Sequence, residues 1–104
     1  MEFIETPIFT REIKKLLPDE EYHRLQIALL IRPDAGDLIQ GGGGLRKLRW
    51  VVPGGGKRGG LRLIYYVDLP DKIYLLFPYK KAARDDLTPS QLKELRKLVK
   101  EVLK

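Results

Sequence analysis

The amino-acid sequence predicts an α+β fold, in which helices pack on an antiparallel-rich sheet in the order βααβββα. Three runs rich in Val, Ile, Leu and aromatic residues, at 45–52, 61–67 and 73–79, have the character of strands. Turn-forming residues separate these runs, so consecutive runs are expected to pair antiparallel. Apolar residues with helical spacing precede and follow them. The chain of 104 residues is predicted to form one domain, 1–104.

The segment before the central runs predicts a short strand and two helices. Glu2 to Glu5 can form the first strand, and Thr6 followed by Pro7 is a typical helix start, with a capping hydroxyl and a proline at the first helical position. Pro18 is expected to end this helix, and Asp19 is placed to cap the next one. The two helices are predicted to lie as a hairpin on the sheet, with helices mainly on one of its faces.

The segment from Arg32 to Gly44 is predicted to be a loop, because it is rich in Pro, Asp and Gly. In the run that follows, alternation places Lys47 and Arg49 on the face opposite Leu48. The same alternation in the next run places Arg62 on a mostly apolar face. Two arginine-bearing strands around a glycine-rich loop therefore form the predicted centre of the molecule.

The C-terminal part predicts one more strand and one more helix. Pro78 is expected to end the third run or to mark a sheet edge, because proline cannot donate a ladder hydrogen bond. Thr88 and Pro89 repeat the helix-start pattern. Apolar residues then recur on one stripe from Leu92 onward, which predicts an amphipathic helix.

Composition excludes several kinds of chemistry. The chain has no cysteine and one histidine, so disulfides, thiolate catalysis and a Cys-bound zinc are excluded, and no metal or other cofactor is predicted. No apolar run approaches the roughly 20 residues that cross a bilayer, and the N-terminus lacks the pattern of a signal peptide. We therefore expect a cytoplasmic protein without a membrane partner.

Positive charge is concentrated in the middle of the chain. Residues 43–84 carry ten lysines and arginines against Asp68 and Asp71, whereas residues 1–42 carry five against eight acidic residues. A basic centre in an otherwise balanced chain is typical of a protein that binds nucleic acid, although a solvated lysine-rich surface gives a similar total.

Arg62 and Tyr79 are the strongest candidates for chemistry. A planar guanidinium can hold a phosphodiester by two hydrogen bonds, and a phenol can transfer a proton or stack on a base. The alternative for Arg62 is a structural ion pair with Asp68 or Asp71. The strand aromatics Trp50, Tyr65 and Tyr66 are expected to fill the core instead of stacking on bases.

Four segments carry a family resemblance: 37–49, which contains Gly-Gly-Leu-Arg-Lys; 56–66, which contains Arg-Gly-Gly-Leu-Arg; Tyr79-Lys80-Lys81; and Asp86-Leu87-Thr88. In these segments the sequence resembles the RelE/HigB-type toxins of bacterial type II toxin-antitoxin modules. The resemblance implies a RelE-like single domain that acts as an mRNA endoribonuclease in the ribosomal A site, without metal. It also implies a cognate antitoxin that itself binds DNA.

The resemblance also implies roles for individual residues. Arg62 matches the strand arginine that holds the scissile phosphate, and Lys47, Tyr79 and Lys81 complete the predicted catalytic set. The family's C-terminal tyrosine and its strand histidines are missing here, so Tyr79 and Lys81 are both candidates for proton transfer. The predicted RNA-binding residues are Arg46, Arg49, Lys57, Arg58, Lys80 and Arg84. The rival hypothesis is a basic RNA- or ribosome-binding module without catalysis.

Overall fold

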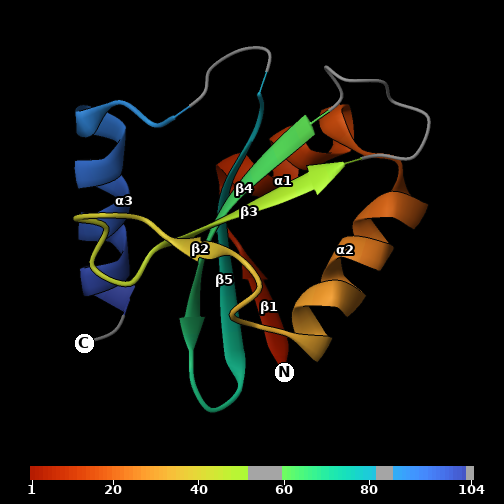
Figure 1. Ribbon diagram of the computed structural model, residues 1–104, viewed down its shortest axis with the longest axis horizontal. Helices are drawn as coiled ribbons and strands as arrows, with labels where there is room; N and C mark the ends of the chain where they lie inside the picture. Colours follow the sequence, from red (N-terminus) through yellow and green to blue (C-terminus); the bar gives the residue numbers. More distant parts are fainter. Residues whose placement is uncertain (52–59, 82–85, 103–104) are drawn as a thin grey trace.

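The computed structural model describes residues 1–51, 60–81 and 86–102, in which three helices pack around a five-stranded sheet (Figure 1). The order along the chain is β1 (Glu2–Glu5), α1 (Pro7–Leu16), α2 (Asp19–Ile31), β2 (Asp37–Leu38), β3 (Arg46–Val51), β4 (Gly60–Asp68), β5 (Lys72–Lys80) and α3 (Pro89–Val102). The predicted α+β class is confirmed. In the described part of the chain no helix is both long and apolar enough to cross a membrane.

The sheet has the strand order β1-β5-β4-β3-β2. β3 pairs antiparallel with β4, and β4 with β5, as the short connections predict. β1 pairs parallel with β5, with Glu2 opposite Lys72 and Glu5 opposite Leu75. The two longest strands, β4 and β5, therefore lie in the interior of the sheet, and the residues of β4 are held from both sides.

The helices cover both faces of the sheet, with α1 and α2 on one face and α3 on the other (Figure 1). Phe9, Ile13, Leu25 and Leu29 from α1 and α2 bury against alternate residues of β3, β4 and β5, among them Leu63. On the other face of the sheet, Val99 of α3 packs with Leu45, Ile64 and Leu76. Alternate residues of β4 therefore pack into two separate cores, one on each face of the sheet.

The two helix starts near Thr6 and Thr88 are as predicted. The Thr6 hydroxyl accepts a hydrogen bond from the Phe9 N–H at 3.1 Å, with Pro7 as the first helical residue. At α3, Thr88 and Gln91 cap each other: the Gln91 N–H donates to the Thr88 hydroxyl, and the Thr88 N–H donates to the Gln91 side-chain oxygen. Both helices therefore begin at positions fixed by local sequence.

The predicted cap of α2 was wrong. Pro18 is the capping residue, and Asp19 lies inside the helix without a side-chain capping bond. Asp19, Glu20 and Glu21 instead form an acidic first turn, where the positive end of the helix dipole favours negative charge. The proline determines the boundary because it ends the preceding helix and gives the chain an extended conformation at this point.

The predicted loop at 32–44 contains a short strand. β2 pairs with β3, with Asp37 opposite Lys47 and Leu38 opposite Arg46. A glycine turn follows, in which the Ile39 N–H donates to the Leu45 carbonyl at 2.9 Å. Gly41, Gly43 and Gly44 have positive φ, which residues with side chains rarely adopt. The four glycines therefore turn the chain from β2 directly into β3.

Tyr65 anchors the segment between α2 and β2. Its buried hydroxyl accepts a hydrogen bond from the Gly36 N–H at 2.8 Å and donates one to the Pro33 carbonyl at 2.7 Å. Burial raises the pKa of Tyr65. The neutral phenol therefore holds this connection to the centre of the sheet, where Trp50 also packs against the core, as predicted for these aromatic residues.

Pro78 does not end the third predicted strand. It lies inside β5, opposite Leu63 of β4. The pairing with β1 stops at Leu75, so within the described ranges β5 has no strand neighbour on its other side at Pro78. Proline is tolerated in strands at such local edges because its missing N–H leaves no central ladder position empty.

Candidate functional site

Three predicted site residues lie in one row across the sheet. Arg49 of β3 is directly opposite Arg62 of β4, and Arg62 is opposite Tyr79 of β5. Directly opposed residues on antiparallel strands have Cβ atoms roughly 5 Å apart, so these three side chains are neighbours. Like charges in this arrangement repel each other, and the pair of arginines therefore favours the binding of an anion between them.

Arg62 is buried, with 8% of its surface exposed, and is the one charged side chain in the described residues that is buried. Its guanidinium makes a long contact of 3.4 Å from Nη1 to the Leu61 carbonyl. Among residues 1–51, 60–81 and 86–102, no carboxylate forms an ion pair with it. A buried guanidinium that has no ion pair within these ranges is stabilised by an anion that binds beside it.

The structural alternative for Arg62, an ion pair with Asp68 or Asp71, is wrong. Asp68 is at the far end of β4, opposite Lys72. Six residues of extended strand separate the two side chains by roughly 20 Å, and Asp71 lies beyond the end of the strand. The guanidinium points instead toward the other end of β4.

Gly60 has no side chain and so leaves space for the Arg62 guanidinium. A Cβ at Gly60 would lie 3.2 Å from Arg62 Nη1 and 3.8 Å from Lys81 Cβ. The Lys81 N–H also donates to the Gly60 carbonyl at 2.9 Å. The structure therefore brings Arg62 and Lys81 to the two sides of one glycine, close together although 19 positions separate them in the chain.

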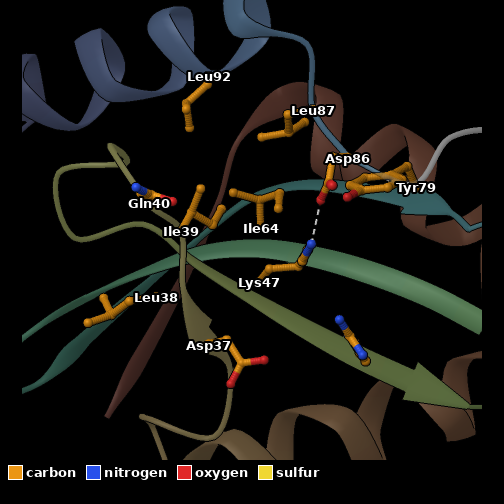
Figure 2. A pocket seen from close by; sticks show the side chains of 11 residues that line it. Asp37, Leu38, Ile39, Gln40, Lys47, Ile64, Tyr79, Asp86, Leu87 and Leu92 are labelled. Atoms are coloured by element: carbon orange, nitrogen blue, oxygen red, sulfur yellow. Dashed lines mark hydrogen bonds and ion pairs between the residues drawn. The ribbon is translucent and has the colours of Figure 1, made fainter.

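A cleft of about 380 Å³ opens beside this row, on the face of the sheet that carries α3 (Figure 2). Its polar wall includes Lys47, Arg49, Tyr79 and Asp86. Its apolar wall is formed by Leu38, Ile39, Ile64, Leu87 and Leu92. A phosphate would meet cations on one side and a nucleoside would meet apolar side chains on the other, which suits the binding of a nucleotide.

Asp86 joins the site, although it was not among the predicted site residues. Its Oδ1 lies 2.5 Å from Lys47 Nζ, and Figure 2 shows the two side chains pointing toward each other. The hydrogen bond and charge of Lys47, with Arg49 and Arg62 farther away, lower the pKa of Asp86. The cations of the site thus have an ionised carboxylate among them, and its signal in the sequence was its place in the Asp86-Leu87-Thr88 segment of the family resemblance.

The ion pair of Lys47 and Asp86 predicts a lowered pKa of Asp86, which nuclear magnetic resonance can measure. In a pH titration, the carboxyl carbon of Asp86 should titrate below its ordinary pKa of 3.8. Because the folded-state pKa is lowered, the ion pair stabilises the protein above the unfolded pKa, and this contribution is lost as pH falls through the folded pKa. In Lys47→Met the midpoint should return toward 3.8, and an unchanged midpoint in that variant would contradict the contact.

The remaining predicted RNA-binding residues are distributed differently. Arg46 is on the opposite face of β3 from Lys47, and its Nη1 donates to the Gly36 carbonyl at 2.8 Å, so its side chain holds the connection before β2. Lys80 is exposed at the end of β5. Lys57, Arg58 and Arg84 lie outside the described residues.

The arrangement suits acid-base and electrostatic chemistry on a phosphate. Arg62 and Lys47 can neutralise charge, and Tyr79 and Lys81 carry protons that can be exchanged. Within the described ranges, no three histidine, aspartate or glutamate side chains are grouped as a metal site requires.

A family model described as "RelE toxin of RelE / RelB toxin-antitoxin system" matches residues 4–104. The chain belongs to the RelE toxin family. It is thus a RelE-type toxin of a toxin-antitoxin system, and the family resemblance read from the glycine-flanked basic segments is confirmed. The RelE match includes α1, α2 and α3 as well as the central strands, so it extends beyond the segments that carried the resemblance.

Proposed function

We propose that this RelE-family toxin is a ribosome-dependent mRNA endoribonuclease that inhibits translation in the cytoplasm, cleaves without metal, and is neutralised by a cognate antitoxin. The observation that supports this most strongly is Arg62, a buried guanidinium opposite a second arginine and next to a cleft of nucleotide size. A module that only attracts RNA needs exposed cations, whereas a buried cation is suited to charge that develops during a reaction.

The proposed reaction is an internal transfer. The ribose 2′-oxygen attacks the adjacent phosphorus while its proton passes to a basic group, the bond to the 5′-oxygen breaks, and that oxygen takes up a proton. The products are a 2′,3′-cyclic phosphate and a free 5′-hydroxyl. Arg62 and Lys47 stabilise the additional negative charge of the phosphorane. Tyr79 and Lys81 are the proposed proton carriers, because both lie beside Arg62.

Asp86 is proposed to position Lys47 for this reaction. A lysine side chain has several rotatable bonds, and the Asp86 carboxylate holds the ammonium in the cleft. The Asp86 side chain is 73% exposed, so it can turn toward solvent when a phosphate takes its place beside Lys47. The ion pair thus keeps a phosphate-binding cation in place before RNA arrives.

The test is primer extension on an mRNA incubated with the purified toxin, with and without ribosomes. We expect the extended primer to stop at new 5′ ends when ribosomes translate the mRNA, and to run the full length of intact mRNA without them. Association with ribosomes without any cleavage would instead favour the non-catalytic RNA-binding module, which the same basic surface would also serve.

The antitoxin is expected to cover part of the basic surface around Lys47, Arg49 and Arg62 with acidic residues, because complementary charge gives such complexes their specificity. The complex of the two proteins should therefore protect Lys47 from acetylation by a lysine-modifying reagent. Equal modification of Lys47 in the free and neutralised toxin, with Lys72 as the internal reference, would contradict this prediction.

A further inference from the structure

The outer surface of α3 is divided into sectors of different charge. With roughly 100° per residue, its apolar side chains Leu92, Leu95, Leu98 and Val99 face the second core. One flank carries only cations, and the other carries Glu94 and Glu101. The four cations are Lys93, Arg96, Lys97 and Lys100, which we call the α3 basic stripe. They are all exposed, and their spacing of three and four residues places them in one row.

The α3 basic stripe has no ion pair in the described residues, unlike cations of the other two helices. Lys15 of α1 pairs with Glu12 at 3.3 Å, and Arg24 of α2 pairs with Glu21 at 3.8 Å. Within the described ranges, no carboxylate pairs with the four cations of α3. Their charge is therefore available to an external anion.

The stripe begins close to the cleft. Leu92, one helical turn before Arg96, lines the cleft, and so does Gln40, which leads into the glycine turn (Figure 2). A Cβ at Gly43 would lie 3.5 Å from Arg96 Nε, so the glycine turn lies beside the stripe. Three of its glycines, Gly41, Gly43 and Gly44, are exposed, and without side chains they allow a close approach of another backbone.

We propose that the α3 basic stripe binds the phosphate backbone of the RNA strand that extends from the cleft across the glycine turn. The proposal rests on the proposed function for the identity of the strand in the cleft. A row of unpaired cations next to an exposed backbone turn has the charge and the shape that a polyphosphate backbone requires.

An acidic protein is the weaker candidate for this surface. Protein interfaces have an apolar centre, but the large exposed hydrophobic side chains of the described residues are all outside α3. Ile27, Leu30 and Ile31 are on α2, for example. The α3 basic stripe therefore offers charge without the apolar contacts that a protein partner would use.

The test compares the binding of two oligonucleotides made of 2′-O-methyl RNA, which lacks the attacking hydroxyl and cannot be cleaved. One has about four nucleotides and fills the cleft, and the other has about twelve and reaches α3. If the longer oligonucleotide makes four additional phosphate contacts, its plot of log binding constant against log salt concentration should have a slope more negative by about 3. Between 50 and 200 mM salt, this corresponds to an additional loss of affinity of about 50-fold.

The deciding variant is Lys93→Gln, Arg96→Gln, Lys97→Gln and Lys100→Gln combined, which should remove the additional slope of the longer strand. The matched control removes four exposed cations of α1 and α2, by Arg11→Gln, Lys14→Gln, Lys15→Gln and Arg24→Gln, and should keep it. The proposal would be overturned if the α3 variant kept the additional slope, or if the control variant lost as much of it. The proposal would also fail if a poly-glutamate peptide of equal charge bound to the stripe while the longer RNA bound no more tightly than the shorter one.

This measurement is independent of catalysis. In one outcome the longer oligonucleotide has the steeper salt dependence, the α3 variant loses this difference, and the toxin cuts no mRNA on ribosomes. This outcome would support the α3 basic stripe and overturn the proposed nuclease. A toxin that cuts mRNA while both oligonucleotides bind with the same slope would overturn the stripe alone.

Discussion

Arg62→Ala is expected to slow mRNA cleavage by about 100- to 1000-fold while the toxin still associates with ribosomes. The phosphorane carries charge that the ground-state diester lacks, so the loss of a charge-stabilising group lowers the rate more than it lowers binding. The burial of Arg62 between Arg49 and Tyr79, which both line the cleft, supports this role, because a buried guanidinium offers little to a distant RNA. Single-turnover cleavage on translating ribosomes measures the effect.

Three further variants separate chemistry from stability. Arg62→Lys should not restore the rate, because an ammonium cannot reproduce the two-point contact of a guanidinium. Lys72→Ala, at the far end of the same sheet, should change the rate little. Arg62→Met keeps an apolar stem and removes a buried cation that has no ion pair in the described residues, so its melting temperature should match or exceed that of the parent. A folded Arg62→Ala toxin that cuts at nearly the parental rate would exclude Arg62 from the active site.

Gly36→Ala is expected to lower the free energy of unfolding by about 2 to 4 kcal/mol. A Cβ at Gly36 would lie 2.7 Å from Tyr65 Cε1 and 2.9 Å from the Lys47 carbonyl oxygen, and neither the buried ring nor the strand backbone can move aside freely. The substitution would also weaken the bond from the Gly36 N–H to the Tyr65 hydroxyl. Urea denaturation measures the loss, and cleavage should fall as well, because β3 carries Lys47.

Gly41→Ala is the control for this prediction. Gly41 has a φ of 71°, and nothing lies within 4 Å of a Cβ built on it. Its substitution adds backbone strain without a clash, at a cost of about 1 to 2 kcal/mol. If Gly36→Ala were no more destabilising than Gly41→Ala, close packing around Tyr65 would not be the reason for the glycine.

Local signals in the sequence determine much of this fold. The helix starts at Thr6 and Thr88 depend on residues within one turn. Alternation puts Lys47 and Arg49 on one face of β3, and the register of β3 with β4 then adds Arg62 to that face. The corresponding part of the candidate site was therefore predictable. Strand pairing then brought Tyr79 next to Arg62, as the order of consecutive strands suggested.

The features that the sequence could not reveal depend on distant contacts. β2 has two residues and no periodicity of its own, and it forms because β3 lies beside it. The parallel pairing of β1 with β5 joins segments about 70 residues apart. Asp86 meets Lys47 across 39 residues, and no local pattern distinguishes it from a turn residue. Arg46, which was predicted to bind RNA, donates to the Gly36 carbonyl through its guanidinium, a contact that forms only in the folded chain.

Because the sheet separates the core into two parts, α3 can open locally while α1 and α2 stay packed on the other face. Among the described residues of α3, Val99 is the one buried hydrophobic side chain, and 8% of it is exposed. By contrast, α1 and α2 bury Phe9, Ile13, Leu25 and Leu29 completely or nearly so. We therefore expect amide protons of α3 to exchange with solvent through local opening, at a lower free energy than those of β4 and β5. Because Leu92 and Leu87 form one wall of the cleft, such opening would widen it without unfolding the sheet, so that the size of the cleft and the exchange rate of α3 should vary together.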